Sequence, residues 1–364
     1  MSSISGIEKR ASGVRGLTVD PVRIRDAKIR DALGRWFMFS DYGAIAQRNM
    51  AIVWSCVLGY ALVDVIWLQG SRLSFASSNW TILLQSVACS TFAGIFIAVA
   101  SSRLAGDQRR PALLLRRVLL LTELLWRTVL PIGGLLVAGA LLTYLITAAN
   151  LPVRDNVLAD IDHLLGFDWL TFLQATNASP LIATLLVRAY NALGLISELV
   201  LIWLVLRRRG ERITEFMAVL SLSTVAVCIG MALVPAAGAF AYFNPAPHLF
   251  ANFSVLSEMW PFLRSFLMLR NGTLTAFDLT ALDGIVSFPS FHTMLGVMTV
   301  YAARDTRWLM IPVTVVNGTM ILATMPVGGH HLSDVLAGAG LTIGAILLVR
   351  LPTRSTPAPE HGAS

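Results

Sequence analysis

Apolar stretches of about 20 residues recur along the chain, and they limit its possible folds more than any other feature. Each stretch is long enough to cross the hydrocarbon core of a bilayer, about 30 Å thick, as a single α-helix. Charged residues make up only 13% of the 364 residues, whereas a soluble domain carries roughly 25%. The chain is therefore predicted to be an all-α, polytopic membrane protein, and an ordinary water-soluble enzyme is excluded.

About eight membrane-spanning helices are predicted from these stretches, and no internal repeat or strand pattern accompanies them. The predicted spans run near residues 50–69, 80–101, 128–149, 181–206, 216–236, 284–302, 307–325 and 331–350.

Two segments between the predicted spans have the pattern of amphipathic helices. Arg116, Glu123 and Arg127 recur at helical spacing after the second span, which predicts an interfacial helix there. After the third span an apolar stripe precedes Gly166, and the acidic residues beside it are predicted to form a solvated helix face. The stripe consists of Val157, Leu158, Ile161, Leu164 and Leu165, and the acidic residues are Asp155, Asp160, Asp162 and Asp168.

The distribution of basic residues predicts the orientation of the chain in the membrane. If both termini are cytoplasmic, 23 of the 28 basic residues lie on cytoplasmic segments, as the positive-inside rule requires. The net charge of +7 is thereby explained without a nucleic-acid partner. The loops after the third and fifth spans then face away from the cytoplasm, towards the periplasm in a bacterium. The five basic residues of that outer side are Arg72, Arg154, Arg188, Arg264 and Arg270.

Five of the six histidines fall on the predicted outer side, and two short motifs contain three of them. Residues 287–293 read SFPSFHT at the start of the sixth span, and residues 328–334 read GGHHLSD at the start of the eighth. The motifs therefore place polar, chemically reactive side chains at one membrane depth on two different helices.

These motifs contain the groups that phosphoryl chemistry needs. His330 and Asp334 stand four residues apart, so on a helix the carboxylate can fix the imidazole tautomer and leave the other ring nitrogen free to attack. His292 can protonate a leaving group. The two helix N-termini are predicted to attract an anion such as phosphate. The neighbouring His331 is predicted to pack or to contact lipid headgroups.

Residues 288–292 (FPSFH) and 330–338 (HHLSDVLAG) resemble the second and third signatures of the type 2 phosphatidic acid phosphatase superfamily. The resemblance implies a six-helix core and phosphoryl transfer through a phosphohistidine, with no metal and no cofactor. It also implies that His330 is the nucleophile, Asp334 its partner and His292 the general acid. Ser290 would bind phosphate through its hydroxyl or backbone amide.

The chain departs from the superfamily pattern at two places. Thr324 stands six residues before the proposed nucleophile, where the phosphatases usually have arginine. A threonine there is similar to the inositol phosphorylceramide synthase branch, and Thr324 is counted with the substrate-binding residues. The first signature, a lysine followed by Arg-Pro, is absent from residues 235–240 (PAAGAF). Because phosphate still needs a cation, Arg270 is predicted to supply it, with Arg264 as second choice.

The resemblance divides the chain into four parts. They are a basic cytoplasmic arm (1–48), two accessory spans with the interfacial helix (49–127), the six-helix core (128–350) and a cytoplasmic tail (351–364).

The function predicted from these residues is an integral membrane phosphatase or phosphotransferase that cleaves a lipid phosphate ester on the outer face. Water as acceptor gives a phosphatase, whereas an alcohol headgroup gives a transferase, as in the inositolphosphotransferases. A non-catalytic transporter or scaffold is the competing class, because it accounts equally well for the spans and the basic loops. Neither the particular lipid nor an oligomeric state follows from the sequence.

Overall fold

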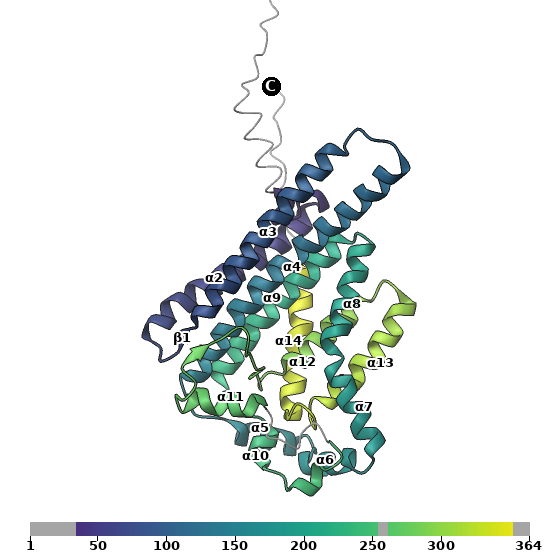
Figure 1. Ribbon diagram of the computed structural model, residues 1–364. Coiled ribbons are helices and arrows are strands. Elements are labelled where there is room, and N and C mark those ends of the chain that lie inside the picture. Colours follow the sequence, from purple (N-terminus) through teal and green to yellow (C-terminus); the bar gives the residue numbers. More distant parts are fainter. Residues whose placement is uncertain (1–33, 254–260, 352–364) are drawn as a thin grey trace, which may run out of the picture.

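The computed structural model describes residues 34–253 and 261–351, and within them the chain is almost wholly helical (Figure 1). Most of the predicted cytoplasmic arm and nearly all of the predicted tail lie outside the described residues. Five of the described helices are long and apolar enough to cross a membrane, or six if the bent pair α6 and α7 forms one span. The prediction of an all-α membrane protein is confirmed.

The long helices that meet this criterion are α2 (Ala44–Gly70), α3 (Ser77–Arg103), α4 (Arg110–Ala148), α9 (Gly210–Leu233) and α14 (Leu332–Arg350). The shorter helices are α5 (Asp155–Leu164), α6 (Trp169–Asn177), α7 (Pro180–Asn191), α8 (Leu193–Leu206), α10 (Ala239–Phe243), α11 (Pro261–Arg270), α12 (Phe291–Ala302) and α13 (Arg307–Ala323). The structure also contains two 3-10 turns, η1 (Ser40–Tyr42) and η2 (Pro247–Phe250). Its two short strands are β1 (Ser74–Phe75) and β2 (Ala276–Phe277).

The predicted interfacial helix after the second span is not a separate element. Its residues form the first part of α4, which continues through the predicted third span without a break. Arg127 is buried and pairs with Asp41 and Glu123 instead of reaching lipid headgroups. These ion pairs within the protein remove the reason for the segment to lie flat on the membrane surface.

Two predicted spans are not single helices of the predicted length in the structure. The predicted fourth span is divided between α7 and α8, and α7 makes an angle of 109° with α6. The predicted sixth span begins only at Phe291, because Ser290 caps α12 and Pro289 precedes it. Residues 284–290 are therefore non-helical, and His292 lies in the first turn of α12.

The main hydrophobic core lies between α2, α4, α8, α9, α12 and α14. In Figure 1, α14 (yellow) runs through the middle of the bundle beside α12, and α2 lies along α4 and α9. The first of the two predicted accessory spans, α2, thus shares its core with α9, α12 and α14. The second, α3, has most of its surface exposed, as is expected of a helix that faces lipid.

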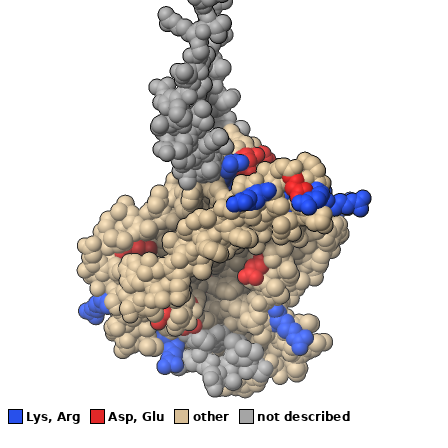
Figure 2. Space-filling model, turned by 45° about the horizontal axis from the view of Figure 1, so that its top comes forward, with Lys and Arg blue, Asp and Glu red and all other residues tan. Residues whose placement is uncertain are grey.

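One end of the bundle carries the short elements α5, α6, α10 and α11 (Figure 1). We call it the histidine end, because α4 and α9 end there, and α12, which contains His292, and α14, which follows His330, begin there. The accessory helices are fastened to it by the parallel pair β1–β2 and by the Asn79 amide, which donates to the Phe277 carbonyl at 2.7 Å. On the face shown in Figure 2, basic side chains lie towards the two ends, and the surface between them is mostly uncharged, with some acidic side chains.

Candidate active site

His330 and Asp334 form a buried pair at the histidine end. The His330 Nδ1 atom lies 3.2 Å from Asp334 Oδ2, and the two side chains are 3% and 0% exposed. His330 precedes α14 rather than lying on it, and Asp334 occupies the first turn. The same carboxylate oxygen accepts the His331 N–H at 2.9 Å, which holds the loop against the helix. A proton on Nδ1, facing the carboxylate, leaves the other ring nitrogen, Nε2, unprotonated.

His292 faces His330 from α12. The centroids of the two imidazole rings are 6.3 Å apart, and the ring planes cross at 60°. One phosphoryl group placed between the rings can contact both of them at this separation. The structure thus brings together the three side chains that the sequence motifs proposed for catalysis.

Tyr190 of α7 supports His292 and was not predicted from the sequence. Its ring stacks on the His292 ring with centroids 4.5 Å apart and planes inclined by 16°. A Cβ atom on Gly328 would lie 3.0 Å from this tyrosine and 3.1 Å from His330. A glycine is therefore needed where the loop passes between them. A lone tyrosine inside a predicted span carries no sequence signal for this role.

Ser290 joins the first turns of α12 and α14. Its hydroxyl accepts the Thr293 N–H at 3.4 Å, and its own N–H donates to the Asp334 carbonyl at 3.1 Å. The side chain is fully buried. Both polar groups proposed as phosphate ligands thus already have partners within the protein, and the phosphate-binding role of Ser290 stays a prediction.

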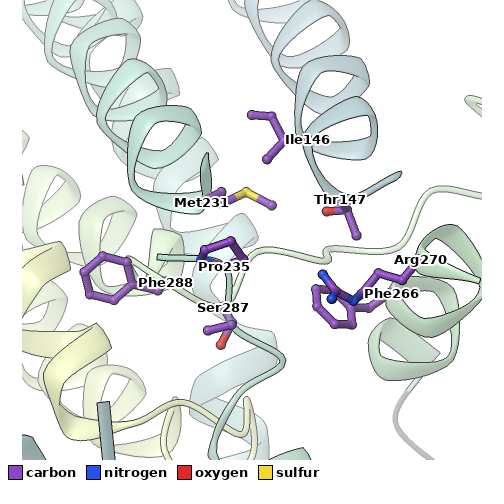
Figure 3. A pocket seen from close by; sticks show the side chains of 9 residues that line it. Ile146, Thr147, Met231, Pro235, Phe266, Arg270, Ser287 and Phe288 are labelled. Carbon is purple, nitrogen blue, oxygen red and sulfur yellow. The ribbon is translucent and has the colours of Figure 1, made fainter. Parts of the chain in front are cut away.

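The three remaining residues predicted to bind substrate have different surroundings. Arg270 ends α11 and points into a pocket that Ser287 and Thr147 also line (Figure 3). Arg264 is exposed on the same helix. The Thr324 hydroxyl is buried and donates to the Ile321 carbonyl at 2.7 Å, while the Thr324 carbonyl accepts the His330 N–H at 3.2 Å.

The Asp155 carboxylate affects the pKa of Arg270. Burial lowers the pKa of the Arg270 guanidinium from its ordinary value, and the nearby Asp155 carboxylate offsets part of this effect. The arginine keeps a charge partner on α5 while its guanidinium borders the pocket.

His331 packs inside the protein, which is the first of the two surroundings predicted for it. The ring is fully buried between two carboxylates of α5, with Asp155 Oδ1 at 3.6 Å from Nε2 and Asp162 Oδ2 at 3.5 Å from Nδ1. The prediction of a solvated acidic face on this helix is therefore wrong for these two aspartates. They are seven residues apart, so they lie on one face two turns apart, and that face is the buried one.

The apolar stripe of α5 accordingly lies on the outside. Leu158 is 2% exposed, but Leu164 is 86% exposed. In a protein that crosses a membrane an exposed apolar face can lie against lipid. The sequence pattern thus identified an amphipathic helix, but the buried face is the acidic one.

Asp155 and Asp162 also bind backbone amides of two loops. Asp155 accepts N–H groups of Ala237 and Gly238, which follow α9. Asp162 accepts those of Leu332 at 2.9 Å and Ser333 at 2.8 Å, in the first turn of α14. Because carboxylates already bind these amides, the prediction that the α14 N-terminus attracts phosphate is wrong.

The pKa values of this cluster follow from the same contacts. Burial alone would lower the pKa of His331, but the carboxylates of Asp155 and Asp162 outweigh it and raise the pKa to about 9. Burial alone would raise the pKa of Asp162, but contacts with His331 and with the Ser333 and Leu332 amides lower it overall. At neutral pH the cluster therefore contains an imidazolium between carboxylates.

Comparison with known proteins settles the family. Residues 156–348, more than half of the chain, match the family model described as the PAP2 superfamily. The chain belongs to the PAP2 superfamily. Its members are generally phosphatases, so the match supports lipid phosphate chemistry in general terms. No curated protein and no solved structure matches the chain.

The superfamily prediction is confirmed, whereas the resemblance to the inositol phosphorylceramide synthase branch stays a prediction. The match begins at residue 156, within α5, so it includes the buried Asp162 and starts directly after Asp155. Among residues 34–253 and 261–351, no group of three His, Cys, Asp or Glu side chains is arranged to hold a metal ion.

The His331 cluster predicts a specific dependence of stability on pH. Because the pKa of His331 is raised in the folded protein, its stabilising contribution is complete below the unfolded pKa of 6.5 and is lost as pH rises through about 9. We expect His331→Gln to destabilise the protein by about 3–5 kcal/mol at neutral pH, because two buried carboxylates lose their cation. Thermal unfolding in detergent from about pH 7 to about pH 10 measures both effects.

The exposed His163 of α5 provides the control, since His163→Gln changes a histidine that is not buried between carboxylates. The wild type and this control should lose stability in parallel as pH rises, whereas His331→Gln should change less. Equal pH dependence in all three proteins would contradict the ion-pair assignment.

Proposed function

We propose that this PAP2 superfamily protein is an integral membrane enzyme that cleaves a lipid phosphate ester through a phosphohistidine at His330. The observation that carries the proposal is the buried His330–Asp334 pair facing His292 across 6.3 Å. A scaffold or transporter needs no such pair, and burying polar groups without a use is unfavourable. The competing class therefore leaves this arrangement unexplained.

In the first step His330 Nε2 attacks phosphorus and forms an N–P bond. The bond from phosphorus to the leaving oxygen breaks, the oxygen keeps the electron pair, and protonated His292 supplies a proton to it. Asp334 holds the proton on Nδ1 and offsets the positive charge that develops on the ring. A phosphate anion between the rings itself favours the protonated form of His292.

In the second step a water or alcohol oxygen attacks the phosphohistidine. His292, now neutral, takes the proton from this oxygen, the N–P bond breaks, and His330 returns to its starting form. The same residues thus serve hydrolysis and transfer, and the acceptor that enters the site decides between them. An alcohol headgroup as acceptor would make the protein an inositolphosphotransferase-like enzyme.

Arg270 is the cation we assign to the phosphate. A transferring phosphoryl group is stabilised mainly by electrostatics, and the superfamily's first-signature cations are absent here. The Arg270 guanidinium borders a pocket at the histidine end, which the exposed Arg264 does not line. We place this end on the extracytoplasmic face and both termini in the cytoplasm, on the strength of the basic-residue distribution.

Substitution of the three catalytic side chains tests the mechanism. His330→Ala and Asp334→Asn should abolish phosphate release from a short-chain lipid phosphate in detergent. His292→Asn should slow it by about 10²–10⁴-fold, because only proton transfer is lost. Released phosphate is the measurement, with His163→Asn as the control of unchanged activity. Normal turnover by His330→Ala would falsify the mechanism.

The nature of the acceptor and the need for metal are tested together. We expect activity to survive an excess of chelator, because the proposed steps use only side chains of the chain. Incubation with labelled phospholipids, with and without inositol, followed by mass spectrometry distinguishes hydrolysis from headgroup transfer. Loss of activity with chelator that returns on adding a divalent metal would instead require a metal site.

A further inference from the structure

An apolar cavity of about 150 Å³ lies between α4 and α9. Leu135, Gly139 and Thr143 of α4 line one side, Val227 and Cys228 of α9 line the other, and residues 282–286 cross it. Both helices are long and apolar enough to span the membrane. The cavity therefore lies within the hydrophobic part of the bundle.

The hydroxyl groups in the cavity wall are already satisfied by the protein. Thr143 donates to the Ala140 carbonyl and Thr224 to the Ser221 carbonyl. The Tyr144 hydroxyl accepts the Asp283 N–H at 2.9 Å. An apolar cavity of roughly this size stays dry and takes up apolar ligands. Its wall therefore favours a hydrocarbon occupant over water or a polar group.

The pocket beside Arg270 lies next to this cavity along α4 and α9, and we call the two together the α4–α9 groove. Thr147 follows Thr143 by one helical turn on α4, and Met231 follows Val227 by one turn on α9. Figure 3 shows Thr147 and Met231 at the ends of these two helices, with the Arg270 guanidinium opposite Ser287. The apolar cavity and the pocket beside Arg270, a small cationic pocket of about 10 Å³, thus follow one another along α4 and α9.

The cationic pocket also borders the catalytic loop. A Cβ atom on Gly238 would lie 3.1 Å from Ser287 Oγ and 2.7 Å from the carbonyl oxygen of Gly329, the residue before His330. On the apolar side, Phe291 lines the cavity and is followed directly by His292. The cavity and the pocket therefore adjoin the segments that hold both catalytic histidines.

We propose that the α4–α9 groove binds the substrate, with a hydrocarbon chain in the apolar cavity and the phosphate between Arg270 and His330. The inference rests on the proposed function and narrows it to long-chain lipid phosphates. A phosphate ester without a chain makes only the headgroup contacts, and it gains nothing from the cavity. The enzyme therefore distinguishes lipid phosphates by the length of the hydrocarbon chain that the cavity between α4 and α9 binds.

Filling the cavity tests this assignment. Gly139 lines the cavity, and a Cβ atom there would make only an ordinary 3.7 Å contact with Tyr60, so Gly139→Leu adds bulk to the cavity wall. We expect kcat/KM for dipalmitoyl phosphatidic acid to fall about tenfold or more, because a few methylenes lose their site. Activity towards p-nitrophenyl phosphate should stay within about twofold of the wild type.

Gly139→Ala is the matched control, because its single methyl leaves most of the cavity open. Should Gly139→Leu fail to fold, as judged by gel filtration in detergent, Val227→Phe fills the cavity from α9 instead. Arg270→Gln should lower kcat/KM for both substrates, since both carry the phosphate.

The outcomes separate the two proposals. Wild-type inactivity on both substrates would refute the enzymatic function itself. Unchanged kcat/KM for the long-chain lipid in a cavity-filled variant would overturn the groove assignment, because the substrate chain would then not occupy the cavity. The enzymatic function would still stand. An equal loss on both substrates would also overturn it, since chain recognition would not be the cause.

Discussion

The bonds between α5 and the first turn of α14 hold the histidine end of this protein together. Asp162 binds two backbone amides of that turn and the His331 ring, and Asp155 binds the same ring and the loop after α9. A buried carboxylate is stable only when charged or polar partners surround it. Three segments far apart in the sequence are thereby fixed around His330, and the loop that carries it has little freedom to move.

The two adjacent histidines, His330 and His331, have different roles in this arrangement. His331 is buried and charged, and it holds the fold, whereas His330 pairs with Asp334 and its ring centroid lies 6.3 Å from that of His292. Because the Leu332 and Ser333 amides of α14 bind Asp162, they are not available to a phosphate. Arg270 lies at the pocket next to this loop, which is why we assign the phosphate contact to it.

The helices of the accessory region and of the core contribute jointly to the site. α2 packs along α4 and α9, and these two helices enclose both the apolar cavity and the pocket beside Arg270. The matched PAP2 region begins only within α5, so α4 lies outside it although it forms one wall of the groove. We infer that the residues of this wall set chain preference, while the matched region supplies the chemistry.

The sequence by itself determined the membrane class, the family and the catalytic candidates, because long apolar runs and two short motifs are local patterns. It did not reveal Tyr190 behind His292, nor the two α5 aspartates around His331. These contacts join residues more than a hundred positions apart, and no local period encodes them. The sequence also predicted a solvated acidic face on α5, whereas Asp155 and Asp162 of that face are buried. An apolar stripe has two apolar environments available, the protein core and the lipid, and only the tertiary structure decides which one it meets.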